Sequence, residues 1–478
     1  MKNAKAQIFS LLLHHTYYIM SSESDNKQAT LALGTQPVGK LLFQYALPAI
    51  IAMVASSMYN IIDRAFIGQV VGPIAISGLA ITFPFMNLSG AFGAAVGVGS
   101  ATAISLKLGQ KDYLSAEEIL GNTVTLNLII GFGFAVICFL FLDPILYFFG
   151  ASKETIPYAR SFMQIILLGN VVTHMYFGMN AVLRAASKPR QAMTATIFTV
   201  LMNIALDVLF ILVLHWGIRG AATATVLSQT LALIYQLKLF SNKKELLHFK
   251  PGIYKLKRRL VKNIVSVGIS PFLMNLCACL VIIFINNQLV RYGGDLSVGS
   301  YGIASAVSTM FVMIVMGLNQ GMQPIAGYNY GAQKLDRVMR VLKLAIMSAI
   351  VIWTIGWLIS MFFPEYIARI FTNDKELIKL SVFAIRVDML VTPVVGLQMV
   401  VTNFFQCIGK VKVSIFLSLS RQLLFLLPLL YTLPLFFGVN GVWYSLPVSD
   451  FIAANVAFVM LLTYMRKFKK QLKLSENG

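Results

Sequence analysis

The chain has 478 residues and a mean hydropathy of +0.76, with 58% hydrophobic residues and only 12% charged ones. A soluble chain of this length needs far more charged surface, so the composition excludes an ordinary soluble protein. The formal net charge is +21, and only the placement of the basic residues can show whether it serves a nucleic-acid partner.

Residues 1–37 precede the first long apolar run and are interpreted as a cytoplasmic leader. The first 19 residues contain a short apolar stretch interrupted by His14 and His15. They make a poor signal peptide, because the stretch is short and no cleavage site of small residues follows it. We expect residues 1–19 to be dispensable, as an extension from a start codon assigned too far upstream.

Twelve apolar runs follow, each long enough to cross a bilayer at about 1.5 Å of helix rise per residue. They are 41–66, 74–105, 119–142, 158–182, 191–214, 220–240, 264–289, 299–329, 338–363, 378–405, 413–437 and 440–465. The sequence therefore predicts an all-α integral membrane protein with twelve transmembrane helices.

Basic residues concentrate in alternate loops between these runs, and most strongly in residues 241–262 and in the tail after residue 465. The intervening loop 68–73 has no basic residue, and loop 215–220 has one arginine. This asymmetry is the positive-inside pattern, which places both termini and the 241–262 segment in the cytoplasm. Membrane topology thus explains the net charge, and we expect no nucleic-acid partner.

The two halves of the chain resemble each other. Residues 77–101 are similar to 301–326, and both lead into related turns, "LGQKD" at 108–112 and "YGAQKLD" at 330–336. We therefore predict an N-lobe of six helices (38–240), a basic linker (241–262), a C-lobe of six helices (263–466) and a cytoplasmic tail (467–478). Because six is even, the repeat is parallel, and two lobes facing each other across a V-shaped central cleft are typical of transporters.

Two aspartates lie within predicted membrane spans of the N-lobe, Asp63 and Asp207. Intramembrane carboxylates are costly and rare, and by default they indicate a functional site. Asn203 lies one helical turn before Asp207, and Thr225 begins the next helix after a short connection. Together these side chains form an oxygen-rich cluster that could hold a proton or a small hard cation.

The two aspartates can also be explained without a functional site. Asp63 precedes Arg64 near a helix end, where it could reach interfacial water or a neighbouring cation. Only about seven apolar residues separate Asp207 from His215 and Trp216, so Asp207 could lie in the outer half of the membrane.

Other polar and sulfur-containing residues carry weaker signals. The four cysteines lie in apolar runs with no accompanying histidine cluster, so no metal site is expected apart from a possible Na⁺ at the aspartates. His174 stands alone in the fourth run, which favours a packed or hydrogen-bonded role. Six polar residues are candidates to line a substrate cleft, although interhelical hydrogen bonding is the favoured explanation of each: Asn87, Asn127, Asn180, Asn275, Asn287 and Gln320.

From about Val38 to Lys470 the chain resembles the multidrug and toxin extrusion (MATE) family, and more closely its MepA-like bacterial branch. The segments that carry the resemblance are "YNIIDRAFIG" (59–68), "LRAASKPRQA" (183–192) and "FFQCIGKVKVSIFLSLSRQLLFLLPL" (404–429). In the family, a bent first helix has a proline fifteen residues before a functional aspartate, as Pro48 precedes Asp63. The family's N-lobe cation site also has an Asn-x-x-x-Asp pair and a threonine, which Asn203, Asp207 and Thr225 match.

The resemblance implies a secondary active transporter, not an enzyme, that exports amphipathic and mainly cationic drugs by H⁺ or Na⁺ antiport with alternating access. It implies no cofactor beyond the coupling ion and no obligate protein partner, with a monomer as the expected state. The expected location is the cytoplasmic (inner) membrane of a bacterium. The chain departs from some members in the C-lobe: residues 264–289 contain no acid, and Asp388 comes too early in the tenth run, so we expect it to pair with Arg386 or another neighbour near the interface.

Three alternatives remain open. A flippase for lipid-linked oligosaccharides is the main one, but it would be expected to use basic residues for pyrophosphate, whereas the charges placed within the membrane are mostly acidic. A membrane-embedded enzyme lacks a visible catalytic constellation, and a channel lacks an evident selectivity filter. No Walker A pattern is present, which disfavours an ATP-driven pump on this chain.

Overall fold

The structure is a computed structural model that describes residues 28–67, residue 70 and residues 73–476. The described residues form helices joined by turns and short loops, without β-strands. The expectation that residues 1–19 are dispensable concerns a segment outside the described residues.

All twelve predicted spans are helical. Spans 1–3 are α2 (Val38–Phe66), α3 (Pro73–Gly109) and α4 (Tyr113–Leu140), with the short α5 (Leu142–Phe148) after them. Spans 5 and 6 are α8 (Pro189–Asp207), which continues as the π-helix η2 (Val208–Val213), and α9 (Ile218–Ser241). Spans 7 and 8 are the two arms of α10 (Arg258–Gly331), which reverses at Gly294, and span 9 is α11 (Leu335–Phe362), followed by α12 (Pro364–Phe371).

Spans 4 and 10 are bent rather than straight, which the apolar pattern did not reveal. Span 4 consists of α6 (Ile156–Leu168) and α7 (Asn170–Ala185), which meet at 56°. Span 10 consists of α13 (Lys375–Asp388) and α14 (Thr392–Cys407), which meet at 52°. At the first break, a Cβ on Gly169 would lie 2.4 Å from the Val226 side chain, so only glycine allows α9 to approach so closely.

The last two spans follow the same pattern as spans 5 and 6. Span 11 is α15 (Val411–Leu419), the π-helix η3 (Ser420–Leu426) and α16 (Leu427–Phe437), and span 12 is α17 (Val439–Glu476). Each half of the chain thus has a π-helix in its fifth span, and a glycine in nearly the same conformation before its sixth. Gly217 has φ 57° and ψ −136°, and Gly438 has φ 56° and ψ −137°.

The turns at the other end of the helices repeat as well. Left-handed residues occur in equivalent turns about 220 residues apart: Lys111 and Gln333 in one pair, Ser187 and Gly409 in the other. In each turn the residue after the left-handed one donates its N–H to a carbonyl five residues earlier, at 2.8–2.9 Å, which is the hydrogen bond of a Schellman motif. The weak sequence similarity between the halves therefore reflects a repeated backbone.

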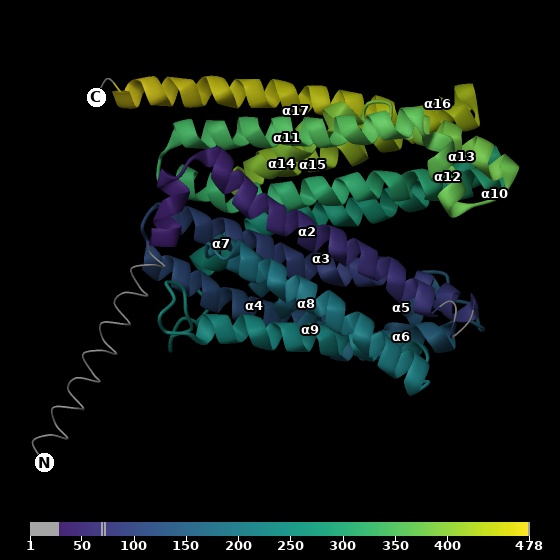
Figure 1. Cartoon of the computed structure of the whole chain (residues 1–478), viewed down its shortest axis with the longest axis horizontal. Coiled ribbons are helices and arrows are strands. Elements are labelled where there is room, and N and C mark those ends of the chain that lie inside the picture. Colours follow the sequence, from purple (N-terminus) through teal and green to yellow (C-terminus); the bar gives the residue numbers. More distant parts are fainter. Residues whose placement is uncertain (1–27, 68–69, 71–72, 477–478) are drawn as a thin grey trace, which may run out of the picture.

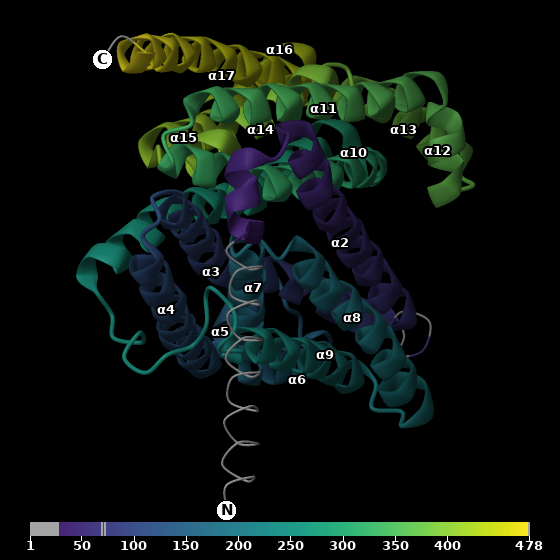
Figure 2. The same ribbon diagram turned by 60° about the vertical axis from the view of Figure 1, so that its left-hand side comes forward.

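The helices form two groups. In Figure 1, α3 to α9 occupy the lower part and α10 to α17 occupy the upper part. The helix α2 lies between these two groups. Figure 2 shows α2 running from the upper group towards α8 in the lower group. One hydrophobic core cluster lies within each group, and the largest cluster contains residues of both, such as Leu41, Ile104 and Met322.

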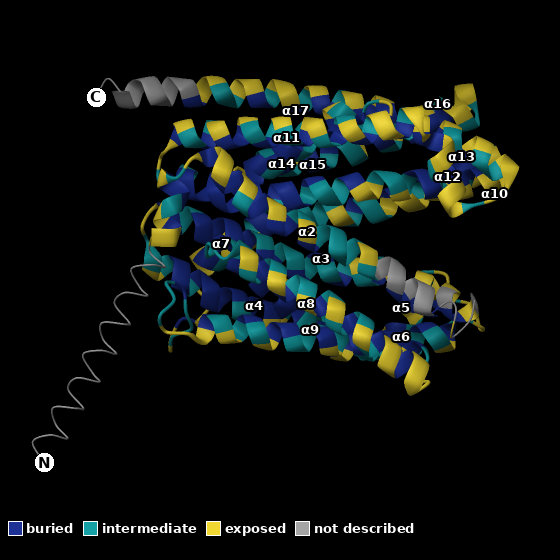
Figure 3. Cartoon of the chain, viewed as in Figure 1, coloured by how far each residue is buried: buried dark blue, intermediate teal, exposed yellow. Residues whose placement is uncertain are grey.

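The outer surface of the bundle is strongly apolar. Large side chains such as Phe132, Phe148, Ile370 and Phe436 are more than half exposed. Figure 3 shows exposed residues along the outer faces of the helices, while buried residues gather where helices meet. This distribution suits a protein whose outer surface faces lipid, because helices satisfy their own backbone hydrogen bonds there.

The basic linker is folded against the N-terminal half. Asn122 of α4 donates to the carbonyl groups of Ile253 and Lys255, and its own carbonyl accepts the Lys257 N–H at 3.0 Å. The Lys250 ammonium pairs with the buried Glu117 carboxylate at 2.6 Å. The linker is therefore docked on α4 rather than hanging free between the two halves.

Candidate cation-binding site

Asp63 and Asp207 come together from two helices that are distant in the sequence. Asp63 lies near the end of α2 and is 9% exposed; Asp207 is the last residue of α8 and is fully buried. The two carboxyl groups are close enough to interact electrostatically. Asp207 also immediately precedes η2, and π-helical turns within α-helices are frequently found at functional sites.

Asn203 and Thr225 lie beside Asp207. When the Asn203 amide is oriented to satisfy both of its polar atoms, its nitrogen donates to Asp207 Oδ2 at 2.9 Å and its oxygen accepts the Thr225 N–H at 3.2 Å. All three residues are buried. The Asn-x-x-x-Asp spacing on α8 therefore places both side chains on the face that packs against α9.

Tyr59 is a further member of this cluster that the sequence analysis did not select. Its hydroxyl group is hydrogen-bonded to Thr225 and interacts electrostatically with Asp63 and Asp207. Tyr59 lies one helical turn before Asp63, so the i, i+4 spacing on α2 was a usable signal. Tyr59, Asp63, Asn203, Asp207 and Thr225 are called the N-lobe cluster below.

The N-lobe cluster offers carboxylate, amide, hydroxyl and phenol oxygens within a largely dry environment. Such a set can share a proton between the carboxylates or bind a small hard cation through oxygen ligands. Among the described residues, no group of three or more His, Cys, Asp or Glu side chains is arranged to hold a metal ion. Oxygen ligands of this kind suit a proton or a small hard cation.

The six cleft candidates are not gathered in one place. Asn127 and Asn180 are buried and bonded within the N-terminal half, to the Thr123 carbonyl at 3.0 Å and the Ala192 carbonyl at 3.0 Å. Gln320 lies at the contact of α10 with α2, next to the Met53 sulfur, while the other three side chains are exposed: Asn87, Asn275 and Asn287.

His174 is fully buried and packed, as its isolation in the sequence suggested. Its Nε2 lies 3.3 Å from the Ser89 hydroxyl, and Ser89 also donates to Asn170. A Cβ on Gly93 of the neighbouring α3 would come within 2.9 Å of the His174 backbone. The histidine therefore sits at a close helix crossing.

The C-terminal half contains a charged cluster that the sequence analysis missed. Arg421 in η3 donates from Nε to Asp450 of α17 at 2.6 Å, and Asp450 is buried. Asp388, at the end of α13, accepts a hydrogen bond from Ser308 and interacts with both Arg421 and Asp450. The expected partner of Asp388 was Arg386 or another neighbour near the interface, and the neighbours that the structure shows are Ser308, Arg421 and Asp450. The sequence did contain a signal for this cluster, because Arg421 and Asp450 are charged residues within the eleventh and twelfth apolar runs.

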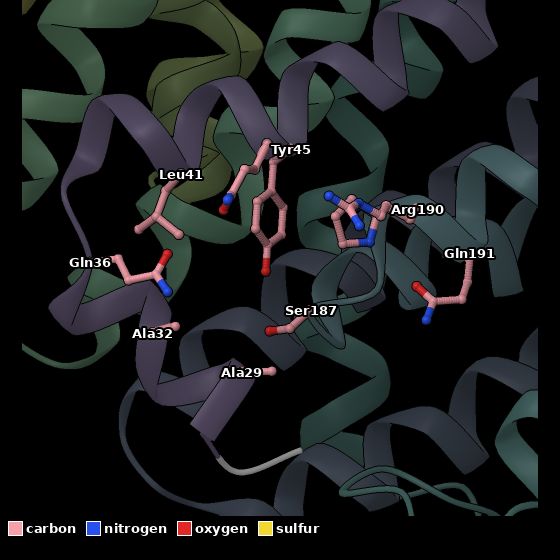
Figure 4. A pocket seen from close by; sticks show the side chains of 10 residues that line it. Ala29, Ala32, Gln36, Leu41, Tyr45, Ser187, Arg190 and Gln191 are labelled. Carbon is pink, nitrogen blue, oxygen red and sulfur yellow. The ribbon is translucent and has the colours of Figure 1, made fainter. Parts of the chain in front are cut away.

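A polar cavity of about 340 Å³ lies at the end of the molecule where the linker is docked. Its lining comes from residues 29–36, from the first turns of α2, from Ser187 and from the first turn of α8. Figure 4 shows Tyr45, Ser187 and Arg190 around this cavity, opposite Ala29 and Ala32. The conspicuous "LRAASKPRQA" segment thus faces the space beneath the N-terminal residues.

Comparison with known proteins relates both the sequence and the fold to transporters. The sequence profile of the MatE family matches residues 48–209 and 269–432. The multidrug export protein MepA of Staphylococcus haemolyticus is 29% identical over 422 residues, covering 88% of this chain and 93% of that protein. MepA of Staphylococcus aureus is 26% identical over 440 residues, covering 92% and 96%.

Solved structures with the same fold include a multidrug resistance MATE family transporter of the MOP superfamily in an outward-facing conformation. It superposes with a TM-score of 0.86 at 24% identity, covering 92% of this chain and 98% of the other. A MOP superfamily transporter from Pyrococcus furiosus superposes with a TM-score of 0.87 at 23% identity, covering 92% and 98%.

Proposed function

Because this chain belongs to the MATE family, we propose that it is a secondary active multidrug efflux transporter, exporting amphipathic and mainly cationic compounds in exchange for protons or sodium ions. The observation that carries the proposal is the N-lobe cluster, in which Asp207 and Asn203 are buried beside Asp63 and Thr225. Two carboxylates sheltered together favour taking up one positive charge, whether a proton or a metal cation.

The position of α2 suggests how cation binding drives transport. The part of α2 near its start packs on α10, while Tyr59 and Asp63 near its end interact with α9 and α8. A cation that enters the N-lobe cluster therefore acts on a helix that contacts both lobes. Pro48 lies inside α2, where its missing N–H weakens the helix, and we propose that α2 bends there when the cation binds.

The drug then binds when the cleft faces the cytoplasm and leaves when rocking of the lobes opens the cleft to the outside. The cationic drug and the coupling ion compete for the same negative charge. They therefore cross the membrane in opposite directions. A ligand shifts such an equilibrium only by its differential affinity for the two states, and the charge of the N-lobe cluster supplies that difference.

The remaining assignments follow the same proposal. The protein functions as a monomer in a bacterial inner membrane, with both termini and the basic linker in the cytoplasm, and it needs no cofactor, obligate protein partner or nucleic acid. Its cargo is small, amphipathic and mainly cationic. The positive-inside distribution supports the orientation.

Ethidium uptake into everted vesicles tests this function, because export from the cytoplasm becomes uptake when the membrane is inside out. Vesicles that contain the protein are used without nucleotide, and pH and sodium gradients are imposed separately. We expect ethidium movement driven by at least one gradient and abolished when that gradient is collapsed. Translocation of a lipid-linked oligosaccharide without gradient-driven ethidium movement would instead establish the flippase alternative.

A further inference from the structure

Residues 28–35, which precede α2, form a short helix, and its last carbonyl groups have no hydrogen-bond donors within that helix. Residues 28–35 are helical, and the last carbonyls of any helix have no intrahelical donor. Residue 37 is a proline, which has no N–H and so cannot bond the Leu33 carbonyl four residues earlier. The Leu33 residue is nevertheless 1% exposed, so its carbonyl needs a partner from elsewhere.

Three side chains of the C-lobe supply those partners. The Asn329 amide donates to the Leu33 carbonyl at 2.9 Å, and the Arg337 guanidinium donates to the same carbonyl at 3.0 Å. Arg337 also donates to the Gln36 carbonyl at 2.6 Å, and the Lys334 ammonium donates to the Gly34 carbonyl at 2.8 Å. Two positive charges at a helix C-terminus are favourable, because the helix dipole is negative there.

The three donors are themselves held in place. Asn329 is fully buried near the end of α10, and its side-chain oxygen accepts from Arg337 Nε at 3.0 Å. Lys334 and Arg337 lie in and just after the turn that joins α10 to α11, the turn that the internal repeat places opposite the "LGQKD" turn of the N-lobe. The arrangement is therefore a preformed set of donors rather than a chance surface contact.

These bonds lie at the end of the molecule where the two lobes are in closest contact. A Cβ on Gly321 of α10 would lie 2.5 Å from the Ala46 backbone, and one on Gly331 would lie 2.2 Å from the Leu106 carbonyl. Side chains at these glycines would push the lobes apart. The lobes are thus closed together at the end that the positive-inside pattern assigns to the cytoplasm.

Among the described residues, a cavity lies on the other side of residues 29–36. This cavity of about 340 Å³ is lined by Ala29, Ala32 and Gln36 on one side, and by Ser187 and the start of α8 at Arg190 on the other (Figure 4). Residues 33–36 are therefore bonded to the C-lobe, while a cavity lies between residues 29–36 and these N-lobe residues.

We propose that residues 33–36, together with Asn329, Lys334 and Arg337, form a cytoplasmic latch that holds the cytoplasmic side closed and must release for the cleft to open inwards. The role of the latch rests on the proposed transport function, but its hydrogen bonds do not involve the N-lobe cluster. Arg337 is a positioning residue that acts through α2, the helix whose far end carries Asp63.

The test measures opening directly, without transport. Ser105, 1% exposed at the lobe contact opposite Gly327, is changed to cysteine in a protein whose four native cysteines are replaced. The rate of its alkylation by a membrane-impermeant maleimide is measured in everted vesicles. We expect Arg337→Ala to raise this rate roughly tenfold, since it removes charge-assisted hydrogen bonds to two carbonyls.

Arg340→Ala is the matched control, because Arg340 lies on the same helix, is exposed and carries the same charge. A second variant, Pro37→Ala, keeps every C-lobe donor but adds a competing N–H for the Leu33 carbonyl, and it should also raise the alkylation rate. Monodispersity on gel filtration confirms folding of each variant. An unchanged rate in both Arg337→Ala and Pro37→Ala, or an equal rise in Arg340→Ala, overturns the latch. Loss of ethidium efflux with normal alkylation would instead point to the coupling site.

Discussion

The Asp63 and Asp207 carboxyl groups interact across the boundary between α2 and α8, although 143 residues separate them in the sequence. Both are sheltered from solvent. A buried pair of like charges is unfavourable unless a positive charge accompanies it. Any movement of α2 that separates the two residues therefore changes the affinity of the site for a cation, and cation binding in turn favours the arrangement that keeps them together.

Replacing Asn203 with alanine should weaken cation binding without abolishing transport. The change removes the amide that donates to Asp207 at 2.9 Å but leaves both carboxylates in place. Hydrogen bonds to charged groups contribute about 1.5–3 kcal/mol, so we expect the apparent affinity for the coupling ion to fall by roughly tenfold or more, with a smaller change in maximal rate.

Efflux measured as a function of the coupling-ion concentration checks this. Asn275→Ala is the matched control, because Asn275 is an exposed amide that bonds only the Pro271 carbonyl of its own helix among the contacts described. If Asn203→Ala and Asn275→Ala shift the ion dependence equally, the contact with Asp207 is unimportant.

Arg421 and Asp450 should behave as a coupled structural pair. Asp450 is buried, and its carboxylate accepts from Arg421 at 2.6 Å, whereas the Arg421 side chain is 34% exposed. Removing Arg421 leaves a buried carboxylate without its partner, which costs about 3–5 kcal/mol, whereas replacing both partners with apolar residues is often close to neutral. We expect Arg421→Leu to lower the unfolding temperature in detergent strongly, Asp450→Leu to lower it less because Arg421 still reaches solvent, and the double variant to recover most of the loss.

Asp388 adds a second acidic group beside the Arg421–Asp450 pair, and its effect on stability can be measured. It interacts with both Arg421 and Asp450, so the double variant keeps one acid in the cluster. Adding Asp388→Asn to the double variant should therefore restore further stability. Additive losses in the two single variants, with no recovery in the double variant, would show that the pair is not coupled.

Asp112 gives a prediction for pH outside the membrane spans. The Lys107 ammonium, at 2.8 Å, and the Ser115 N–H lower the pKa of Asp112 from 3.8 to about 2. Because the folded pKa is the lower one, the stabilisation is present above about pH 4 and is lost as pH falls towards 2. The side chain is 36% exposed, so solvent screening limits the effect to about 1 kcal/mol or less.

Unfolding temperatures of the wild type and Asp112→Asn between pH 7 and pH 2.5 measure this contribution. The wild type should be slightly more stable at neutral pH, and the difference should shrink as the solution is acidified. Asp336→Asn, an exposed acid in the equivalent turn of the C-lobe, serves as the control. A difference that grows on acidification would reverse the expected sign.

The sequence was sufficient for much of the architecture because apolar run length and loop charge report directly on membrane spans. The similarity of the "LGQKD" and "YGAQKLD" turns likewise identified the repeat, since left-handed turn residues recur at Lys111 and Gln333. The bends in spans 4 and 10 were not predicted, because the apolar pattern continues through them and tertiary contacts such as Val226 against Gly169 fix the break.

The candidate site was likewise predictable from the sequence only in part. The spacing of Asn203 and Asp207 placed them on one helix face, but the electrostatic interaction of Asp207 with Asp63 depends on how α2 packs, which no local pattern specifies. The C-lobe cluster went unnoticed because Arg421, Asp450 and Asp388 lie on three different helices and look unrelated in the sequence. Hydrogen bonds to the Leu33 carbonyl were similarly hidden, although Pro37 signalled that this carbonyl needed an outside donor.

The central claim is that Asp63 and Asp207 couple cation entry to drug export, and neutral substitution tests it most directly. Gradient-driven ethidium export is measured as uptake into everted vesicles for the wild type, Asp63→Asn, Asp207→Asn and the exposed-acid control Asp336→Asn, each at matched amounts of inserted protein. The account predicts that at least one of the two site variants loses gradient-driven efflux while Asp336→Asn retains it. Full gradient-driven efflux in both Asp63→Asn and Asp207→Asn would contradict it.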